Sequence, residues 1–168
     1  MKSENSTLVQ IEDCVRNLGD ENAVVRESAR MELIALGGDE VVRALIEALT
    51  DYRAQVRWEA AKALHSLADP VAADALVQAL DDENDGVRWV AAEALIALKE
   101  TGLRAVLGGL AVRAGSVTFC HSAHHVLQAL KGLSSTVAPV LQALKMSQPA
   151  VTTPPVAYEA CLELSHLS

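Results

Sequence analysis

Apolar residues recur three or four positions apart in the middle of the first half of the chain, at Val56, Ala60, Ala63, Leu64 and Leu67. At about 100° per residue they gather on one side of a helix, which predicts an amphipathic helix. Pro70 follows where another helix can begin, because the missing N–H of proline has no partner in a first turn anyway. A further apolar stripe completes a predicted helical hairpin, with Ala73, Leu76, Val77 and Leu80.

The hairpin pattern occurs three times. Residues 25–49, 56–80 and 87–110 align when the sequence is shifted by 31 residues. Self-similarity at a fixed period of this length is the mark of a repeat array. A single hairpin cannot bury both of its stripes, so neighbouring hairpins must stack on one another. The pattern therefore predicts an all-α protein built as a solenoid.

A fourth repeat can be aligned in two registers. Placing Val117 opposite Val87 leaves the following apolar residues out of phase. Placing Phe119 there instead brings three more apolar residues onto the buried stripe, namely Ala123, Val126 and Leu130. We therefore predict that Phe119 is the core residue.

The predicted organisation is one repeat domain over residues 1–168 with about ten helices. A capping helix within residues 1–19 turns Leu8, Ile11, Val15 and Leu18 inward. The repeats then span residues 20–49, 50–80, 81–112 and 113–146. Proline and polar residues predict a loop over 147–155. A last capping helix over 156–168 turns Val156, Ala160, Leu164 and Leu167 inward.

The first helix of the unit carries the pattern V-R-x-x-A-A-x-A-L-x-x-L, with an aspartate five residues before the valine. It occurs from Val56 to Leu67 with Asp51, and from Val87 to Leu98 with Asp82. This pattern resembles the HEAT-like repeat of the phycobilisome-lyase type, over about residues 20–110. The resemblance implies a right-handed α-solenoid (an α-α superhelix), whose concave side is lined by the first helix of each repeat and grips ligands.

Stacking places equivalent positions of successive repeats side by side. The position two residues after the repeat valine lies about 200° from it, opposite the buried stripe. This column contains Glu27, Trp58, Trp89, His121 and Tyr158. The column six residues after the valine contains Met31, Lys62, Glu93, His125 and Leu162. The column nine residues after it contains Ile34, His65, Ile96, Gln128 and Ser165. Both tryptophans of a chain with 3% aromatic residues therefore fall in one outward column.

Exposed tryptophan and tyrosine are typical of interaction hot spots. We predict a partner-binding groove with Trp58 and Trp89 as apolar anchors, Tyr158 and Ile96 beside them, and a polar rim of Glu59, Lys62, Glu93, His121 and His125. The alternative is that the large side chains only cover gaps between helices. Exposed tryptophans could also serve a homodimer.

Arginines and aspartates recur as well, at Arg26, Arg57 and Arg88 and at Asp20, Asp51 and Asp82. A basic binding stripe is one interpretation. We favour a structural ladder between the arginines and the acidic turns, since aspartate also suits helix capping.

Sequence motifs for catalysis are missing. Deoxyhypusine hydroxylases resemble this repeat but carry His-Glu after the valine-arginine pair, whereas the equivalent pairs here include Trp58-Glu59 and His121-Ser122. There is no P-loop, G-x-S-x-G or H-E-x-x-H sequence. His121 and His125 lie four residues apart beside His124, a weak zinc signal that surface histidines also explain. We therefore expect no cofactor, no metal and no enzyme activity.

Composition limits the class of partner and the compartment that we expect for this protein. The formal net charge of −8 argues against nucleic acid, which requires a basic stripe, and is compatible with a basic partner. No run approaches the length of a membrane span, and the polar start shows no signal peptide. The three cysteines, Cys14, Cys120 and Cys161, form no CxxC pair and suit a reducing compartment. We expect a cytoplasmic protein.

Together these features predict a non-catalytic adaptor that binds a protein or peptide. The alternative is a bilin-lyase-like or chaperone-like factor, because bilin lyase subunits share the resemblance and an aromatic groove suits a flat tetrapyrrole or its carrier protein.

Overall fold

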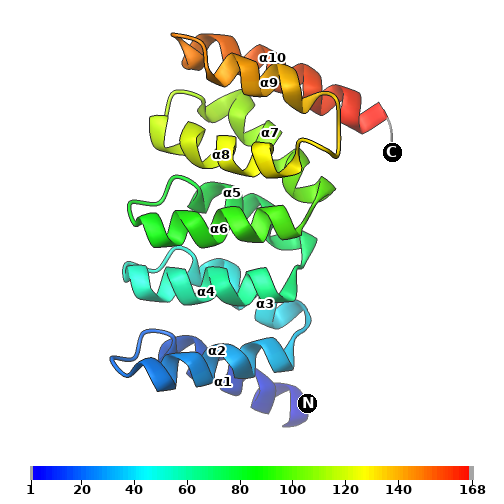
Figure 1. Ribbon diagram of the computed structural model, residues 1–168. Coiled ribbons are helices and arrows are strands. Elements are labelled where there is room, and N and C mark those ends of the chain that lie inside the picture. The colour runs from blue at the N-terminus through cyan, green and yellow to red at the C-terminus, as the bar shows by residue number, and fades with distance from the viewer. Residues whose placement is uncertain (1, 167–168) are drawn as a thin grey trace.

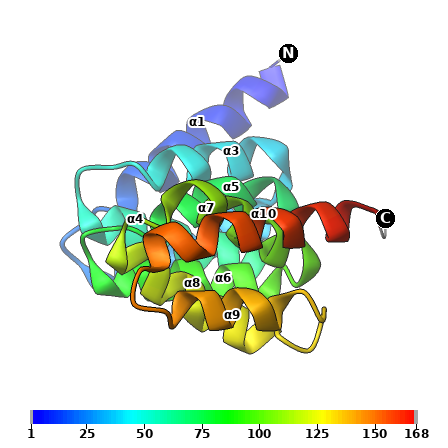
Figure 2. The same ribbon diagram turned by 90° about the horizontal axis from the view of Figure 1, so that it is seen from above.

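The computed structural model describes residues 2–166, in which every regular element is a helix. Ten α-helices and one short 3-10 helix stack in two layers (Figures 1 and 2). The first layer contains α2 (Ala23–Leu36), α4 (Ala54–Leu67), α6 (Asp85–Ala97), α8 (Val117–Leu130) and α9 (Val137–Leu144). The second contains α1 (Lys2–Asn17), α3 (Gly38–Ala48), η1 (Pro70–Ala72) with α5 (Ala73–Ala79), α7 (Glu100–Arg113) and α10 (Pro149–His166). The predicted α-solenoid is confirmed.

Side chains in the turns start the helices of the first layer. Asn22 caps α2 by accepting a hydrogen bond from the backbone N–H of Val24, and Asn84 caps α6 by accepting one from Val87. Ser116 caps α8 in the same way. Each cap satisfies a backbone donor that the first turn of a helix leaves unpaired. Polar turns of this kind mark where α2, α6 and α8 begin, whereas α4 begins without a side-chain cap.

The core lies between the two layers, where the predicted stripes meet. Val56, Leu64 and Leu95 are fully or almost fully buried. In the fourth repeat Phe119 is 0% exposed and Val117 is 69% exposed, which confirms the chosen register. None of the helices between residues 2 and 166 is long and apolar enough to cross a membrane.

The C-terminal end differs from the prediction in where its last helix begins. The loop predicted over residues 147–155 is wrong, because α10 starts at Pro149 and runs through Pro154 and Pro155. These two prolines leave the carbonyls four residues earlier without a helical donor. Both of those residues, Ala150 and Val151, are exposed, so water can serve their carbonyls. Leu167, which we expected to turn inward, lies outside the described residues.

The last two helices also exchange layers. A regular repeat would place α9 on α7 and α10 on α8. Instead α9 packs on α8 and α10 packs on α7 and α9 (Figure 2). The buried face of α10 contains Thr153, Ala157, Ala160 and Leu164, so the predicted inward positions Ala160 and Leu164 are buried against a different neighbour. A buried stripe specifies which face of a helix turns inward but not which helix covers it.

The recurring arginines hold each repeat to its own turn. In all three repeats the guanidinium donates to the two carbonyls five and six residues earlier: Arg26 to Asp20 and Glu21, Arg57 to Asp51 and Tyr52, Arg88 to Asp82 and Glu83. The aspartate of each turn accepts the backbone N–H two residues later, at 2.8 Å. Arg57 also forms a two-pronged ion pair with Asp82 of the next repeat, at 2.6 and 2.8 Å. The predicted structural ladder is confirmed, with the aspartates closing the turns rather than capping the helices.

Removal of Arg57 should be costly. Arg57 and Asp82 are both largely buried, so Arg57→Ala leaves the Asp82 carboxylate without its ion-pair partner and two turn carbonyls without the guanidinium donor. We expect a loss of about 3–5 kcal/mol in the free energy of unfolding, measured by urea denaturation. The control is Arg43→Ala on α3, where an exposed arginine pairs with Glu40 of the same helix and the expected loss is below about 1 kcal/mol. Equal losses for both variants would contradict the ladder.

Two glycines of α7 should respond to alanine in opposite directions. A Cβ at Gly102 would lie 1.9 Å from the backbone oxygen of Leu95, whereas one at Gly108 would meet open space. Gly102→Ala should therefore cost about 3 kcal/mol through overpacking, and Gly108→Ala should stabilise by up to about 1 kcal/mol through helix propensity. Urea midpoints of the two variants check this; a stable Gly102→Ala protein would show that α6 and α7 are not packed this closely.

Candidate functional site

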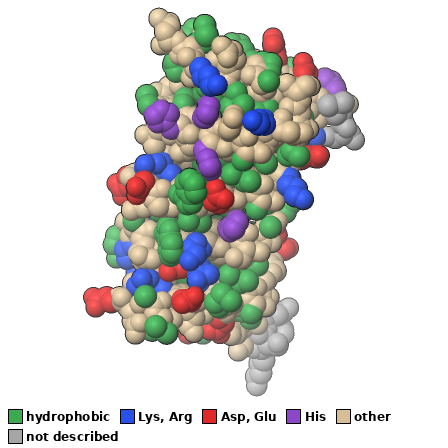
Figure 3. Space-filling view, viewed as in Figure 1, with side chains coloured by type: hydrophobic (Ala, Val, Ile, Leu, Met, Phe, Trp, Pro, Cys, Tyr) green, Lys and Arg blue, Asp and Glu red, His purple; other side chains and the backbone are tan. Residues whose placement is uncertain are grey.

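The outer surface of α2, α4, α6 and α8, here called the first-helix face, is the face seen in Figure 3. It carries the two tryptophans, Trp58 on α4 and Trp89 on α6. An open depression of about 670 Å³ lies between α4 and α6 on this face. It is lined by Trp58, Lys62, His65, Asp85, Gly86, Trp89, Val90 and Glu93. Four residues predicted for the groove, namely Trp58, Lys62, Trp89 and Glu93, therefore come together in one place.

The indole of Trp58 is half-buried and held on two sides. The ammonium of Lys62 lies 4.3 Å from the centre of the ring, a cation–π contact within the same helix. On the α6 side the indole lies over Gly86, where a Cβ would come within 3.4 Å of its Cδ1 atom. Gly86 therefore forms the α6 side of the depression next to the indole of Trp58.

Trp89 is 59% exposed and is supported by the next repeat. The ring of His125 on α8 lies 4.9 Å from the Trp89 ring, tilted by 30°. His125 in turn places its Nε2 atom 3.0 Å from a carboxylate oxygen of Glu93. One face of Trp89 is thus covered by its own protein, and the rest of the ring remains available to a partner.

Glu59 does not belong to the rim. It is 4% exposed and pairs with two arginines of α2, at 2.9 Å with Arg30 and 3.6 Å with Arg26. The position three residues after the valine lies about 60° from the buried stripe, on the side that meets the preceding repeat. Its role in the structure is to join α2 to α4.

Two further predicted residues lie away from the depression. Tyr158 is exposed but sits on α10 in the second layer, so the layer exchange removes it from the tryptophan column. Ile96 is half-buried and packs against the core near the end of α6. His121 is exposed on α8, one row beyond Trp89.

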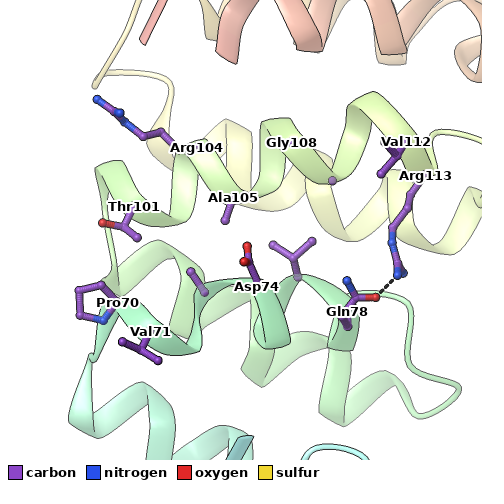
Figure 4. A pocket seen from close by; sticks show the side chains of 13 residues that line it. Pro70, Val71, Asp74, Gln78, Thr101, Arg104, Ala105, Gly108, Val112 and Arg113 are labelled. Atoms are coloured by element: carbon purple, nitrogen blue, oxygen red, sulfur yellow. Dashed lines mark hydrogen bonds between the residues drawn. The ribbon is translucent and has the colours of Figure 1, made fainter. Parts of the chain in front are cut away.

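A second depression of about 680 Å³ lies between α5 and α7 on the opposite layer (Figure 4). Its walls are formed largely by small and aliphatic residues such as Ala105, Gly108 and Val112, with Arg113 bonded to Gln78 at one end. The sequence did not indicate this surface, because small residues such as those of α7 are also typical of closely packed helices. The two depressions are equal in size, so residue type decides between them, and tryptophan is the stronger indicator of a binding site.

Candidate metal ligands do not come together in the described part of the chain. No cluster of three or more His, Cys, Asp or Glu side chains among residues 6–166 could hold a metal ion. The three cysteines are free, and burial raises the pKa of each thiol, to about 11 for Cys14. A protonated thiol is a poor nucleophile.

The histidines of α8 lie next to a lysine of α9. Burial lowers the pKa of His124 below its ordinary value of 6.5, and Lys145, His121 and His125 lower it further by repulsion. Protonation of this imidazole is therefore disfavoured in the folded protein.

His124 should make the fold less stable in acid. The unfolded chain takes up its proton near pH 6.5, whereas the folded chain takes it up only at lower pH, so stability contributed by this residue is lost as pH falls below 6.5. The advantage of wild type over His124→Gln should shrink between pH 8 and pH 5, measured by urea denaturation at each pH. An advantage that stays constant across this range would contradict the assignment.

Comparisons with known proteins agree with the repeat architecture. The family model for HEAT repeats matches residues 11–96, just over half of the chain. In a search of solved structures, the chain is similar to one in the complex of CpcE and CpcF of phycocyanin lyase from Nostoc sp. PCC7120, with 25% identity and a TM-score of 0.52. The match covers 93% of this chain and 65% of that chain, so this protein spans about two thirds of the length of its structural relative. No curated protein matches. The chain belongs to the HEAT-repeat family.

Proposed function

We propose that this protein is a cytoplasmic, non-catalytic adaptor that binds a protein or peptide on its first-helix face. The observation that supports the proposal is the depression between α4 and α6, where Trp58 and Trp89 are brought together from two repeats. The core stripe is complete without either indole, and Trp89 is more than half exposed. A monomer gains nothing in stability from leaving so large an aromatic surface in water.

The depression suits an apolar side chain of a partner better than a small polar molecule. Its two indoles supply apolar area, while Lys62 and Glu93 place one charge of each sign at its edges. Such an arrangement of aromatic anchors with a polar border is typical of protein interfaces. The site is also open, as required for a polypeptide that lies across several helices.

Loss of both indoles should abolish specific binding. A random twelve-residue peptide library displayed on phage would be selected on the wild-type protein, and the affinity of the enriched peptides measured by calorimetry. The Trp58→Ala, Trp89→Ala double variant should bind them at least about 30-fold more weakly, the loss of one hot spot or more. Urea denaturation of the same variant shows whether it is folded.

The matched control removes two exposed apolar residues from the other depression. Val71 and Val112 line the space between α5 and α7, and both are largely exposed. The Val71→Ala, Val112→Ala variant should retain wild-type affinity. If the tryptophan variant kept its affinity for the peptides and the valine variant lost it, the binding site would lie on the second layer.

A tetrapyrrole or its carrier protein is the second candidate ligand. It is favoured by the structural likeness to a phycocyanin lyase complex and by two indoles that could flank a flat conjugated ring. Biliverdin would be titrated into the wild-type protein and into the tryptophan double variant. A shift in its absorption spectrum that requires both indoles would support this candidate. An unchanged spectrum at high protein concentration would contradict tetrapyrrole binding and leave the peptide-binding adaptor as the one candidate.

A further inference from the structure

Acidic residues are distributed very unevenly along this chain. Of the 22 aspartates and glutamates, 20 lie within residues 1–100 and two at positions 159 and 163, so residues 101–158 contain none. The same 58 residues contain four arginines and lysines and three of the five histidines. The net charge of −8 therefore describes the N-terminal part of the solenoid and not its C-terminal part.

The fold brings several of these basic groups onto the first-helix face. His121 is exposed and His124 is half-buried on α8, and Lys145 of α9 is close enough to lower the pKa of His124 by repulsion. Lys131 is exposed at the end of α8. We call His121, His124, Lys131 and Lys145 the basic patch. Figure 3 shows histidine side chains gathered on the upper part of this face, above the tryptophan depression.

The basic patch keeps its hydrogen-bonding capacity for a partner. Glu93 of α6 is the acid at its border, and this carboxylate is engaged by His125. No ion pair joins a member of the patch to an acidic side chain among residues 6–166, whose side chains the structure describes. The exchange of layers also matters here, because it places Lys145 of α9 beside α8 rather than on the opposite layer. The two ammonium groups and the imidazole of His121 are thus exposed, and the imidazole of His124 is half-buried, with no ion-pair partner among the described carboxylates.

The patch continues the candidate binding site. His125 joins α8 to Trp89 and Glu93 of α6, so the tryptophan depression and the basic patch meet along this contact. A polypeptide that crosses the helices from α4 towards α9 passes first over the indoles and then over His121, His124 and Lys145. Its first part meets apolar surface, and its second part meets the ammonium group of Lys145 and two imidazoles that can donate hydrogen bonds.

We propose that the partner of the first-helix face is an acidic polypeptide segment, with an apolar anchor for Trp58 and Trp89 followed by carboxylates that lie over the basic patch. This inference rests on the proposed function and specifies its partner. A basic partner, with which the net charge alone is compatible, fits this end of the face less well. A nucleic acid fits less well, because only two of the four patch residues carry a permanent charge and the rest of the protein is strongly acidic.

The test uses three pools of fluorescent twelve-residue peptides. Each has six positions randomised among Leu, Ile, Phe, Tyr, Pro and Ala, followed by six glutamates, six glutamines or six lysines. Fluorescence anisotropy at 50 mM NaCl should show the glutamate pool binding about three- to tenfold more tightly than the glutamine pool, the effect of a few exposed ion pairs. The lysine pool should bind most weakly. The advantage of glutamate should shrink at 500 mM NaCl, where exposed charges are screened.

Variants separate this inference from the proposed function. Lys131→Gln with Lys145→Gln should remove most of the glutamate advantage, whereas Arg43→Gln, which removes a positive charge on α3, should leave it intact. Equal binding of the glutamate and glutamine pools to the wild-type protein would overturn the acidic partner. The adaptor itself would still stand if the tryptophan double variant weakened both pools.

The remaining outcomes are equally decisive. A glutamate advantage that persists in a tryptophan double variant with unchanged affinity would support the patch and overturn the anchor. A twelve-residue oligothymidylate that displaces the glutamate pool at lower concentration than free glutamate peptide would reassign the patch to nucleic acid. Failure of all three pools to bind would overturn both proposals.

Discussion

One arginine per repeat binds two carbonyls of the turn that precedes its own helix, and the rest of the solenoid depends on this contact. A repeat protein has contacts only between neighbours, so the angle between successive repeats must be set locally. The turn carbonyls lie between two helices, outside the hydrogen bonds of either, and need a donor from elsewhere. The guanidinium of Arg57 satisfies two of them and reaches Asp82 of the next repeat, which ties three segments to a single planar group.

Two buried ion pairs between repeats have consequences for the binding face. The buried pair between Arg30 and Glu59 joins α2 to α4, and the pair between Arg57 and Asp82 joins α4 to the turn before α6. Both use charged groups to join one repeat to the next, where close packing of alanines alone would leave little directional control. The tryptophan side chains can then project from helices whose spacing is already fixed. A rigid pair of anchors loses less conformational entropy on binding than a flexible one.

Periodicity predicted the helices, the buried stripes and the register of Phe119, because each depends on the spacing of apolar residues along one helix. It could not predict the layer exchange of α9 and α10, because a stripe does not identify its neighbour. The same limit applies to the residues of the candidate site, whose positions on a helix can be predicted but whose neighbours cannot. Trp58 and Trp89 follow from the column argument, whereas Glu59 was misplaced because a polar residue near the buried stripe can be paired rather than exposed. The basic patch could have been found from the absence of Asp and Glu over residues 101–158. The net charge of the whole chain hides this difference, because it sums the acidic N-terminal part and the basic C-terminal part.

Equivalent positions of successive repeats fall into two groups, those that pack between helices and those that face outward. Positions that pack between helices vary little from repeat to repeat, as with Val56 and Val87, because every repeat has the same space to fill. The outward column changes from Glu27 to Trp58, Trp89 and His121, because nothing in the stacking restricts it. A change of chemistry along an unrestricted column produces a surface with a direction, acidic at one end, aromatic in the middle and basic at the other. A partner that reads all three can bind in only one orientation, which is a form of specificity that a uniform array of repeats cannot provide.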